Sequence, residues 1–339
     1  MDIRKTLELL TGVAGVSGAE SEASRTALEL LSEYAPGAQC DAFGNVTALI
    51  PAQDASAPTL MLDAHIDQIG FIVSYIDPDG FLKVGACGGP DMRIMLAQSV
   101  TVHGVQDIRG VVSTLPPHVS SDHTKVPEAG EIAIDIGMTR EEAEKAVPLG
   151  SRVTVDSDFR DLSDCVISAP SVDDRSGVCA VLCALDMLRG RKLRYNLAVC
   201  FSAQEETGER GVKGAAFRLQ PDEAIAVDVS FGRTPDSVPH ETAVLGSGAM
   251  IGYSAALDRG MSDALKSAAE KNGIPYTIEV MPSSTGTNAD SISISRAGVK
   301  CCTVSIPIRY MHTPIETVRL SDIESAARLI CEYAAGGKN

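Results

Sequence analysis

Strand-like apolar runs alternate with helical patterns through the second half of this chain, and this alternation restricts the fold more than any other feature. Residues 195–202, 224–229 and 302–306 have the length and apolar content of buried strands, whereas residues 177–188 and 261–271 have helical patterns. A chain that alternates strands with helices forms a mostly parallel sheet with helices on both faces. We therefore predict an α/β fold around a mixed, mostly parallel sheet.

The alternation is interrupted between residues 68 and 163. A hairpin pattern with the turn Asp77-Pro-Asp-Gly80 opens this stretch, short β-like runs follow it, and only residues 139–147 have a helical pattern. Short strands at this spacing are typical of a small barrel or sandwich. The chain is therefore predicted to form a discontinuous α/β domain, 1–67 and 164–339, with an inserted all-β domain, 68–163.

Helices are also expected in the N-terminal part of the chain. The sequence Ser17-Gly-Ala-Glu20 has the Ser-x-x-Glu spacing of a capping box and precedes an apolar run with Leu30 and Leu31. In a capping box the serine hydroxyl and the glutamate carboxylate satisfy backbone N–H groups at the start of a helix. We therefore expect Ser17 to cap a helix.

Imidazole and carboxylate side chains follow the predicted strands of the α/β domain where the strands end. The carboxyl ends of strands in such a sheet lie along one edge, which is where these folds bind ligands. We therefore expect residues that are far apart in the sequence to converge on one rim. They are His65 and Asp67 after strand 59–64, Asp173 and Asp174 after segment 166–169, Glu205 and Glu206 after strand 195–202, Asp228 within strand 224–229, and His312 after segment 302–306.

Two imidazoles with at least three carboxylates and no thiolate form a ligand set for zinc, cobalt, manganese or a similar divalent ion. A two-metal hydrolase needs one carboxylate that bridges the ions and another that accepts a proton from the attacking water. The adjacent pair Glu205-Glu206 suits that division, because neighbouring side chains at a strand end point in different directions. The pattern therefore predicts a two-metal site.

Each of these residues also has an ordinary structural explanation. His-x-Asp occurs as a surface ion pair, and Asp-Asp or Glu-Glu usually belongs to a solvated loop or a helix cap. For this reason the other histidines stay unassigned: His103, His118, His123 and His240. The ordinary explanation does not account for five apolar strands that all end in such groups, where an unpaired charge is costly. The joint pattern favours a metal site.

The composition argues against several other classes of function. A net charge of −16 and the lack of tryptophan disfavour nucleic acid and anionic membranes as partners. No run of about 18 apolar residues occurs, and no apolar leader follows the N-terminus. Nine cysteines without a CxxC pair indicate reduced thiols and a cytoplasmic protein. The chain has no Gly-x-Ser-x-Gly motif, which argues against a serine hydrolase.

Eight segments match motifs of one known family, in the family's order and over nearly the whole chain. They are Ala64–Phe71, Gly88-Gly89, Leu115–His118, Ile134–Gly137, Val172–Arg175, Gln204–Gly208, Ile225–Asp228 and Ile306–His312. With these segments the chain resembles the glutamyl aminopeptidase family, the relatives of the tetrahedral aminopeptidases within the wider group of dinuclear zinc or cobalt exopeptidases.

The resemblance implies a dinuclear metal-dependent aminopeptidase that releases N-terminal residues from short peptides. His65, Asp173 and Asp228 would bind one ion, and Asp173, Glu206 and His312 would bind the other, with Asp173 as the bridge. Two zinc or cobalt ions per subunit are expected, with manganese as a further candidate.

The resemblance also implies the roles of the residues around the ions. Glu205 would be the general base that generates a metal-bound hydroxide, and Asp67 would orient His65. The peptide bond between Asp173 and Asp174 is expected to be cis.

For the inserted domain, the resemblance implies a role in dimerisation and a homo-oligomer, either a dimer or a hollow tetrahedral dodecamer of six dimers. The composition does not bear on this assembly. Three segments depart from the usual family motifs near the expected substrate position: Gln68, Ser284–Asp290 and Asp228–Arg233. The preferred N-terminal residue therefore stays open between acidic, basic and neutral side chains.

Other enzymes use the same kind of ligand set. Two-metal carboxypeptidases, amide deacylases and glycan-active relatives all stay open as alternatives on the ligands alone, and so does a non-catalytic binding protein that kept the scaffold. The match along the whole chain favours the aminopeptidase.

Overall fold

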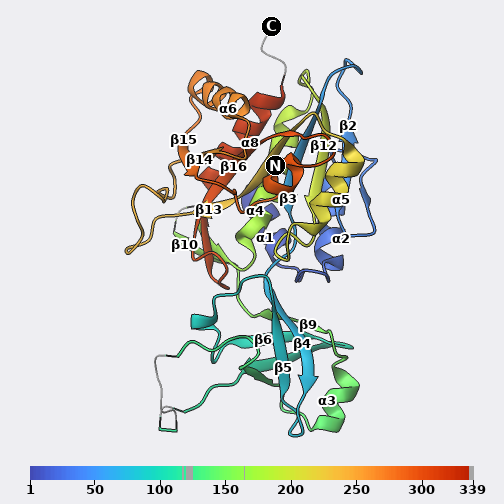
Figure 1. The fold of residues 1–339 in the computed structure, drawn as a ribbon, viewed down its shortest axis with the longest axis vertical. Helices are drawn as coiled ribbons and strands as arrows, with labels where there is room; N and C mark the ends of the chain where they lie inside the picture. Colours follow the sequence, from blue (N-terminus) through green and yellow to red (C-terminus); the bar gives the residue numbers. More distant parts are fainter. Residues whose placement is uncertain (117, 120–124, 164, 336–339) are drawn as a thin grey trace.

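The computed structural model describes residues 1–116, 118–119, 125–163 and 165–335. Figure 1 shows a larger lobe with a mixed sheet and most of the helices, and a smaller lobe that is a β-barrel. His123, Pro117 within the segment Leu115–His118, and residue 164 at the predicted domain bound lie outside the described part of the chain.

A mixed sheet of 11 strands forms the centre of the larger lobe, as the sequence predicted. Its four central strands run parallel to one another, and antiparallel strands flank them on both sides. In spatial order the sheet contains β1 (Gln39–Cys40), β2 (Val46–Ile50), β12 (Asn196–Ser202), β3 (Thr59–His65), β13 (Glu223–Phe231), β16 (Lys300–Arg309), β17 (Glu316–Arg319), β11 (Val166–Ala169) and β10 (Arg160–Ser163). Strand β14 (Ala249–Ser254) also pairs with β16, and β15 (Tyr276–Met281) pairs with β14.

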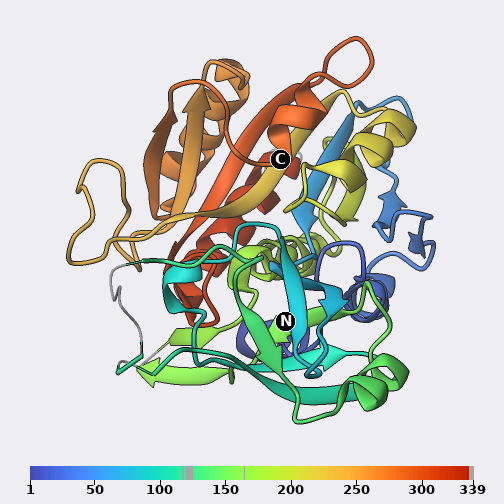
Figure 2. The ribbon, with the colours of Figure 1, turned by 60° about the horizontal axis from the view of Figure 1, so that its bottom comes forward.

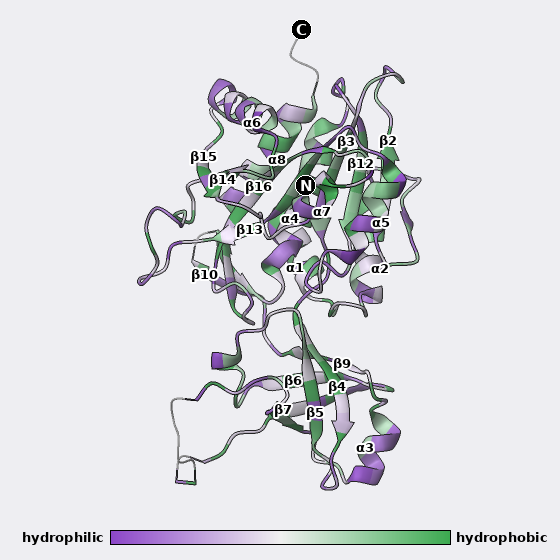
Figure 3. Ribbon diagram, in the orientation of Figure 1, coloured by the Kyte–Doolittle hydropathy of each residue, from purple (hydrophilic) through white to green (hydrophobic). Residues whose placement is uncertain are grey.

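Helices cover both faces of this sheet because side chains of its strands alternate between two apolar cores. In β3, Leu60 and Leu62 face the larger core, whereas Met61 faces the smaller core. The larger core is covered by α1 (Ile3–Thr11), α2 (Ser21–Ser32), α4 (Val172–Leu188), α6 (Arg259–Asn272) and α8 (Leu320–Ala334), and the smaller core by α5 (Arg210–Leu219) and α7 (Ala289–Ser293). Figure 3 shows hydrophobic residues concentrated in the central strands between these layers.

The smaller lobe is a closed six-stranded barrel, so of the two predicted all-β forms the barrel is the one observed. Side chains such as Val100 and Val102 alternate into its own apolar core. Figure 2 brings this lobe forward. The strands close in the order β4 (Gly70–Ile76), β5 (Leu82–Cys87), β8 (Ala133–Asp135), β7 (Asp107–Val112), β6 (Ser99–His103) and β9 (Arg152–Val155), and the short helices are η1 (Met92–Ile94) and α3 (Arg140–Ala146).

Two local predictions were wrong. Ser17 does not cap α2, which begins at Ser21; its hydroxyl donates to Asp67 instead, and the carboxylate of Glu20 accepts from the N–H of Gly18. The sequence from Ala289 to Ala297 also has a helical pattern, but α7 ends at Ser293, four residues earlier. In both cases a tertiary contact or a turn replaces the local pattern.

Two further features concern the whole chain. None of the nine cysteines forms a disulfide, and seven of the nine are buried. Among the described residues, no helix has both the length and the apolar content that a membrane span requires.

Candidate metal centre

The predicted residues come together at the carboxyl ends of five strands that all run in one direction. Strands β12, β3, β13 and β16 are parallel neighbours, and β11 has the same direction because β11 and β16 are both antiparallel to β17. The predicted residues are His65 at the end of β3, Asp173 after β11, Glu205 and Glu206 after β12, Asp228 in β13 and His312 after β16.

Asp173 lies between the two imidazoles. Its Oδ1 is 3.0 Å from Nε2 of His65, and its Oδ2 is 3.4 Å from Nε2 of His312. Oε1 of Glu206 is 3.5 Å from the same nitrogen of His312. One carboxylate therefore faces both histidines with different oxygens, which is the arrangement that a bridging ligand requires.

Two further carboxylates approach His65. Oε2 of Glu205 and Oδ1 of Asp228 each lie 4.0 Å from Nε2 of this histidine. Donor atoms within 4.8 Å of one another define two groups that could each bind an ion: His65, Asp173 and Glu206, and His65, Asp174 and Asp228. Asp174 was quoted in the sequence analysis without a role.

Asp67 connects strand β3 to the loop after β12. Its Oδ1 accepts a hydrogen bond from the N–H of Glu205 at 2.9 Å, and its Oδ2 accepts one from the N–H of Glu206 at 3.2 Å. The same carboxylate lies 3.4 Å from Nδ1 of His65 and accepts the hydroxyl of Ser17. Asp67 is fully buried and positions three residues of the site at once.

Backbone contacts fix the other ligand candidates. The two oxygens of Glu316, on β17, accept the N–H groups of Asp173 and His312 at 2.9 Å and 2.8 Å. Asp174 accepts the N–H of His65 at 3.2 Å, and the peptide bond that joins it to Asp173 is cis, as expected. Sequence reasoning missed Glu316, whose only local signal is its position four residues after His312.

The barrel also reaches the site, through the turn that follows β5. The carbonyl of Gly89 is 2.9 Å from Nδ1 of His312 and orients this ring. A Cβ atom on Gly88 would lie 2.9 Å from Oε2 of Glu206, and one on Gly89 would lie 3.2 Å from Nδ1 of His312. A side chain at either position of this turn would therefore crowd Glu206 or His312.

The protonation equilibria of the site reflect an excess of buried negative charge. Burial raises the pKa of Glu205 to about 7 and that of Glu206 to about 8. Burial alone would also raise the pKa of Asp173, but hydrogen bonds with His312 and His65 lower it overall. The contact with Asp173 in turn raises the pKa of His312 to about 9.

This surplus of carboxylates fits a cation. None of the ion pairs of the described residues joins a lysine or arginine to Asp173, Glu205, Glu206 or Asp228. The donors are imidazole nitrogens and carboxylate oxygens, the set that zinc and related divalent ions prefer. The same residues line a recess of about 640 Å³ that also includes Val229, Gly286 and Met311.

The remaining described histidines lie elsewhere. His103 contacts Asp107 and Thr154 in the barrel, with Nδ1 2.9 Å from Oδ1 of Asp107. His240 is exposed and near Glu241, and His118 is an exposed residue of the barrel lobe. Leaving these residues unassigned was therefore consistent with the structure.

Comparison with known proteins gives a consistent result. The family model described as M42 glutamyl aminopeptidase matches residues 44–329. A lysyl aminopeptidase from Pyrococcus furiosus is 33% identical over 322 residues, which cover 93% of this chain and 92% of the relative.

Two solved structures have the same fold. An aminopeptidase from the archaeon Desulfurococcus kamchatkensis superposes with a TM-score of 0.92 at 33% identity and covers 98% of this chain and 94% of its own. The TET1 peptidase of Pyrococcus horikoshii, which can assemble into a tetrahedron or a large octahedral shell, superposes with a TM-score of 0.85 at 28% identity, over 98% of this chain and 99% of its own. On the match of the family model and of these relatives along nearly their whole length, the chain belongs to the M42 family of metal-dependent aminopeptidases.

Proposed function

We propose that this aminopeptidase binds two divalent ions, zinc or cobalt or else manganese, on either side of Asp173. His65 and Asp228 complete the ligands of one ion, and Glu206 and His312 complete those of the other. The observation that carries this assignment is the position of the Asp173 carboxylate, 3.0 Å from one imidazole and 3.4 Å from the other. Asp174 serves a different purpose in this assignment, because its two oxygens accept the backbone N–H groups of His65 and Gly177.

When bound, the ions supply positive charge that acidifies a water molecule and polarises the carbonyl group of the peptide. Glu205 accepts the proton of this water and later donates it to the leaving amine, so that the scissile C–N bond is broken and one water is consumed. Burial raises the pKa of Glu205 to about 7, which is the direction that makes a carboxylate a better proton acceptor.

Asp67 is a positioning residue in this mechanism. By accepting the N–H groups of both Glu205 and Glu206, it fixes the loop from which one glutamate binds metal and the other transfers protons. Its contact with Nδ1 of His65 directs Nε2 of that ring towards the ion.

The substrates are short peptides with a free N-terminus. A panel of aminoacyl-p-nitroanilides, measured beside N-acetylated peptides and carboxymethylcellulose, tests this with metal-stripped enzyme reconstituted with zinc, cobalt or manganese. Turnover of unblocked substrates alone supports the proposal. Turnover of blocked peptides or of the polysaccharide would instead favour a deacylase, an endopeptidase or a glycan-active enzyme. The panel also decides between acidic, basic and neutral first residues; the P. furiosus relative is named for lysine.

We also propose that the inserted domain, 68–163, mediates dimerisation and that the enzyme is a cytoplasmic homo-oligomer. The P. horikoshii relative, which forms a tetrahedron or an octahedral shell, supports this assignment by analogy. Light scattering coupled to size-exclusion chromatography measures the mass directly. A monomer at micromolar concentration would contradict the proposal.

A further inference from the structure

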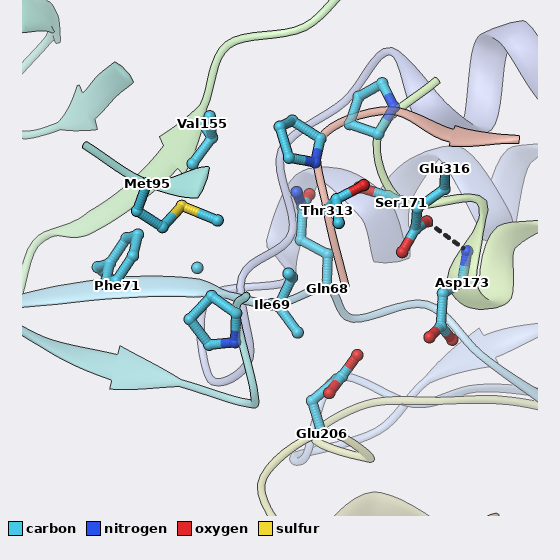
Figure 4. A pocket seen from close by; sticks show the side chains of 14 residues that line it. Gln68, Ile69, Phe71, Met95, Val155, Ser171, Asp173, Glu206, Thr313 and Glu316 are labelled. Atoms are coloured by element: carbon cyan, nitrogen blue, oxygen red, sulfur yellow. Dashed lines mark hydrogen bonds between the residues drawn. The ribbon is translucent and has the colours of Figure 1, made fainter. Parts of the chain in front are cut away.

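A second, largely apolar pocket lies next to the metal centre, between the barrel and the sheet. Figure 4 shows the side chains of Phe71, Met95 and Val155, from the barrel, on one side of it and the carboxylates of Asp173 and Glu206 on the other. The space between these side chains, counted together with the open solvent at its mouth, is about 430 Å³. The wall of the pocket therefore combines apolar side chains of the barrel with two carboxylates of the proposed ligand set.

The pocket and the metal-binding recess share Asp173 and Glu206 as lining residues. A peptide whose scissile carbonyl lies at the ions therefore has the side chains next to that bond within reach of the pocket. Apolar walls beside a small number of polar groups are typical of sites that recognise part of a small ligand.

Ser171 gives an independent indication that the pocket takes a ligand. This residue lines the pocket, is 7% exposed, and its hydroxyl has no hydrogen-bond partner. The other polar side chains of the lining have partners: Thr313 donates to the carbonyl of Tyr310, and Gln68 accepts from Gly15 and Arg175. A buried hydroxyl without a partner is unfavourable, so a bound molecule that reached Ser171 would supply the hydrogen bond that the protein does not.

We infer that this pocket is a substrate subsite, which receives an apolar side chain of one of the two residues that flank the scissile bond. The Ser171 hydroxyl donates a hydrogen bond to an oxygen of the same peptide. The inference rests on the proposed function, because it places the peptide at the ions. It adds the class of side chain accepted there and the residues that select it.

Ile69 is the residue through which the subsite can be tested. It lines the pocket and is only partly buried, so its replacement disturbs the barrel core less than a replacement of Met95, which is fully buried. Ile69→Ala enlarges the pocket and Ile69→Phe fills it. Ile72→Ala is the matched control, since Ile72 lies three residues further along, is also partly buried and does not line the pocket.

Two substrate series separate the flanking positions. One varies the first residue of Xaa-p-nitroanilides through Gly, Ala, Val, Leu and Phe, and the other varies the second residue of dipeptides whose first residue is the best one of the first series. In one of the two series we expect Ile69→Ala to raise the ratio of kcat/KM for the Phe substrate to kcat/KM for the Ala substrate by about tenfold or more. Ile69→Phe should lower this ratio, and Ile72→Ala should leave it unchanged.

Ser171→Ala provides the second measurement. Because the hydroxyl has no partner in the protein, its removal should leave Tm unchanged or raise it, while KM rises several-fold with little change in kcat. The subsite is overturned if the enzyme is active, neither Ile69 variant changes the preference for substrate side-chain size in either series, and Ser171→Ala leaves KM unchanged. That outcome is expected for a pocket that holds only water. Absence of turnover in every series would overturn the proposed function instead.

Discussion

The carboxylate of Glu316 accepts a hydrogen bond from the backbone N–H of Asp173 at 2.9 Å, the contact drawn in Figure 4. Its other oxygen accepts the N–H of His312. Glu316 is 2% exposed, so the geometry of these bonds is protected from competition with water. One side chain thus connects the two proposed ligands that come from β11 and β16, and it does so without contributing a ligand atom.

Glu316→Gln should weaken metal binding without removing a ligand. A glutamine can accept only one of the two N–H groups and presents an NH₂ donor to the other, so the unfolding free energy should fall by about 1–3 kcal/mol. The dissociation constant of the metal should rise by about 10- to 100-fold, as is usual for residues that position ligands. Competition titration with a chromophoric chelator measures this constant.

A matched control exists for this variant. Asp322, in the first turn of α8, is equally buried and accepts two backbone N–H groups, those of Gly246 and Gly248. Asp322→Asn should lose comparable stability with unchanged metal affinity. Equal effects of both variants on metal affinity would mean that Glu316 acts only through general stability.

Glu205→Gln should fold, retain two ions and lose nearly all activity. The amide cannot accept a proton from water, and general-base groups contribute about 10²- to 10⁴-fold to the rate. Steady-state kinetics and elemental analysis on the same preparation give the two quantities. Glu206→Gln should instead lose metal, so the adjacent glutamates separate the two roles. Substantial turnover by Glu205→Gln would contradict the assignment of the base.

His312→Ala should reduce the metal content from two ions to one per subunit. The substitution removes an imidazole that faces Asp173 and Glu206 at 3.4 Å and 3.5 Å, and it leaves the ligands on the His65 side in place. Inductively coupled plasma spectrometry after dialysis measures the stoichiometry. His240→Ala, which alters an exposed histidine, is the control and should retain both ions. If His312→Ala still contained two metal ions per subunit, the assignment of His312 as a metal ligand would be wrong.

The imidazole and carboxylate side chains at the strand ends could be predicted, because each is recognisable from the residues next to it in the sequence. Each apolar strand and the polar residue at its end, such as His65 after Thr59–Ala64, are contiguous in the sequence, and strand direction brings the ends together. The chemistry of these residue types then indicates metal ions. The same argument holds for the barrel, whose short strands and turns follow one another closely along the chain.

The contacts that fix the rim could not be predicted from the sequence. Ser17 reaches Asp67 across 50 residues, Glu316 reaches Asp173 across 143, and Gly89 reaches His312 across 223. The neighbouring sequence alone allows another role for such a residue; Ser17, for example, has the spacing of a helix cap. Its contact with Asp67 in the folded chain determines which role it has. Strand β17, which carries Glu316, has only four residues and was missed for the same reason.

Glu279→Gln should stabilise the protein at neutral pH but not at acidic pH. Glu279, on β15, is partly buried and accepts the hydroxyls of Ser230 and Ser305, and burial raises its pKa above the ordinary value. The folded state therefore retains this proton to a higher pH than the unfolded state, and the wild type loses stability as the pH rises through the raised pKa. A glutamine does not titrate, so Glu279→Gln does not lose stability in this way.

The difference in Tm between Glu279→Gln and the wild type should accordingly increase from pH 4.5 towards pH 8, as measured by scanning fluorimetry. Glu29→Gln changes an exposed glutamate of α2 and serves as the control, with a difference that does not depend on pH. Parallel pH profiles of the wild type and Glu279→Gln would show that the carboxyl titrates normally.

Gly88→Ala should disable the metal centre from the barrel side. Gly88 has a φ of 74°, and an added Cβ would lie 2.9 Å from Oε2 of Glu206. Gly137→Ala is the matched control, because Gly137 has a φ of 68° and nothing within 4 Å of the added atom, so it isolates the cost of the backbone conformation. Both variants should lose about 1 kcal/mol of stability from that cost. Only Gly88→Ala should also release metal and lose activity, because its methyl group crowds Cγ2 of Ile69 at 2.8 Å as well as Glu206, whose carboxylate has to move. Equal metal content in the two variants would mean that the turn after β5 tolerates the side chain and that the barrel does not shape the site.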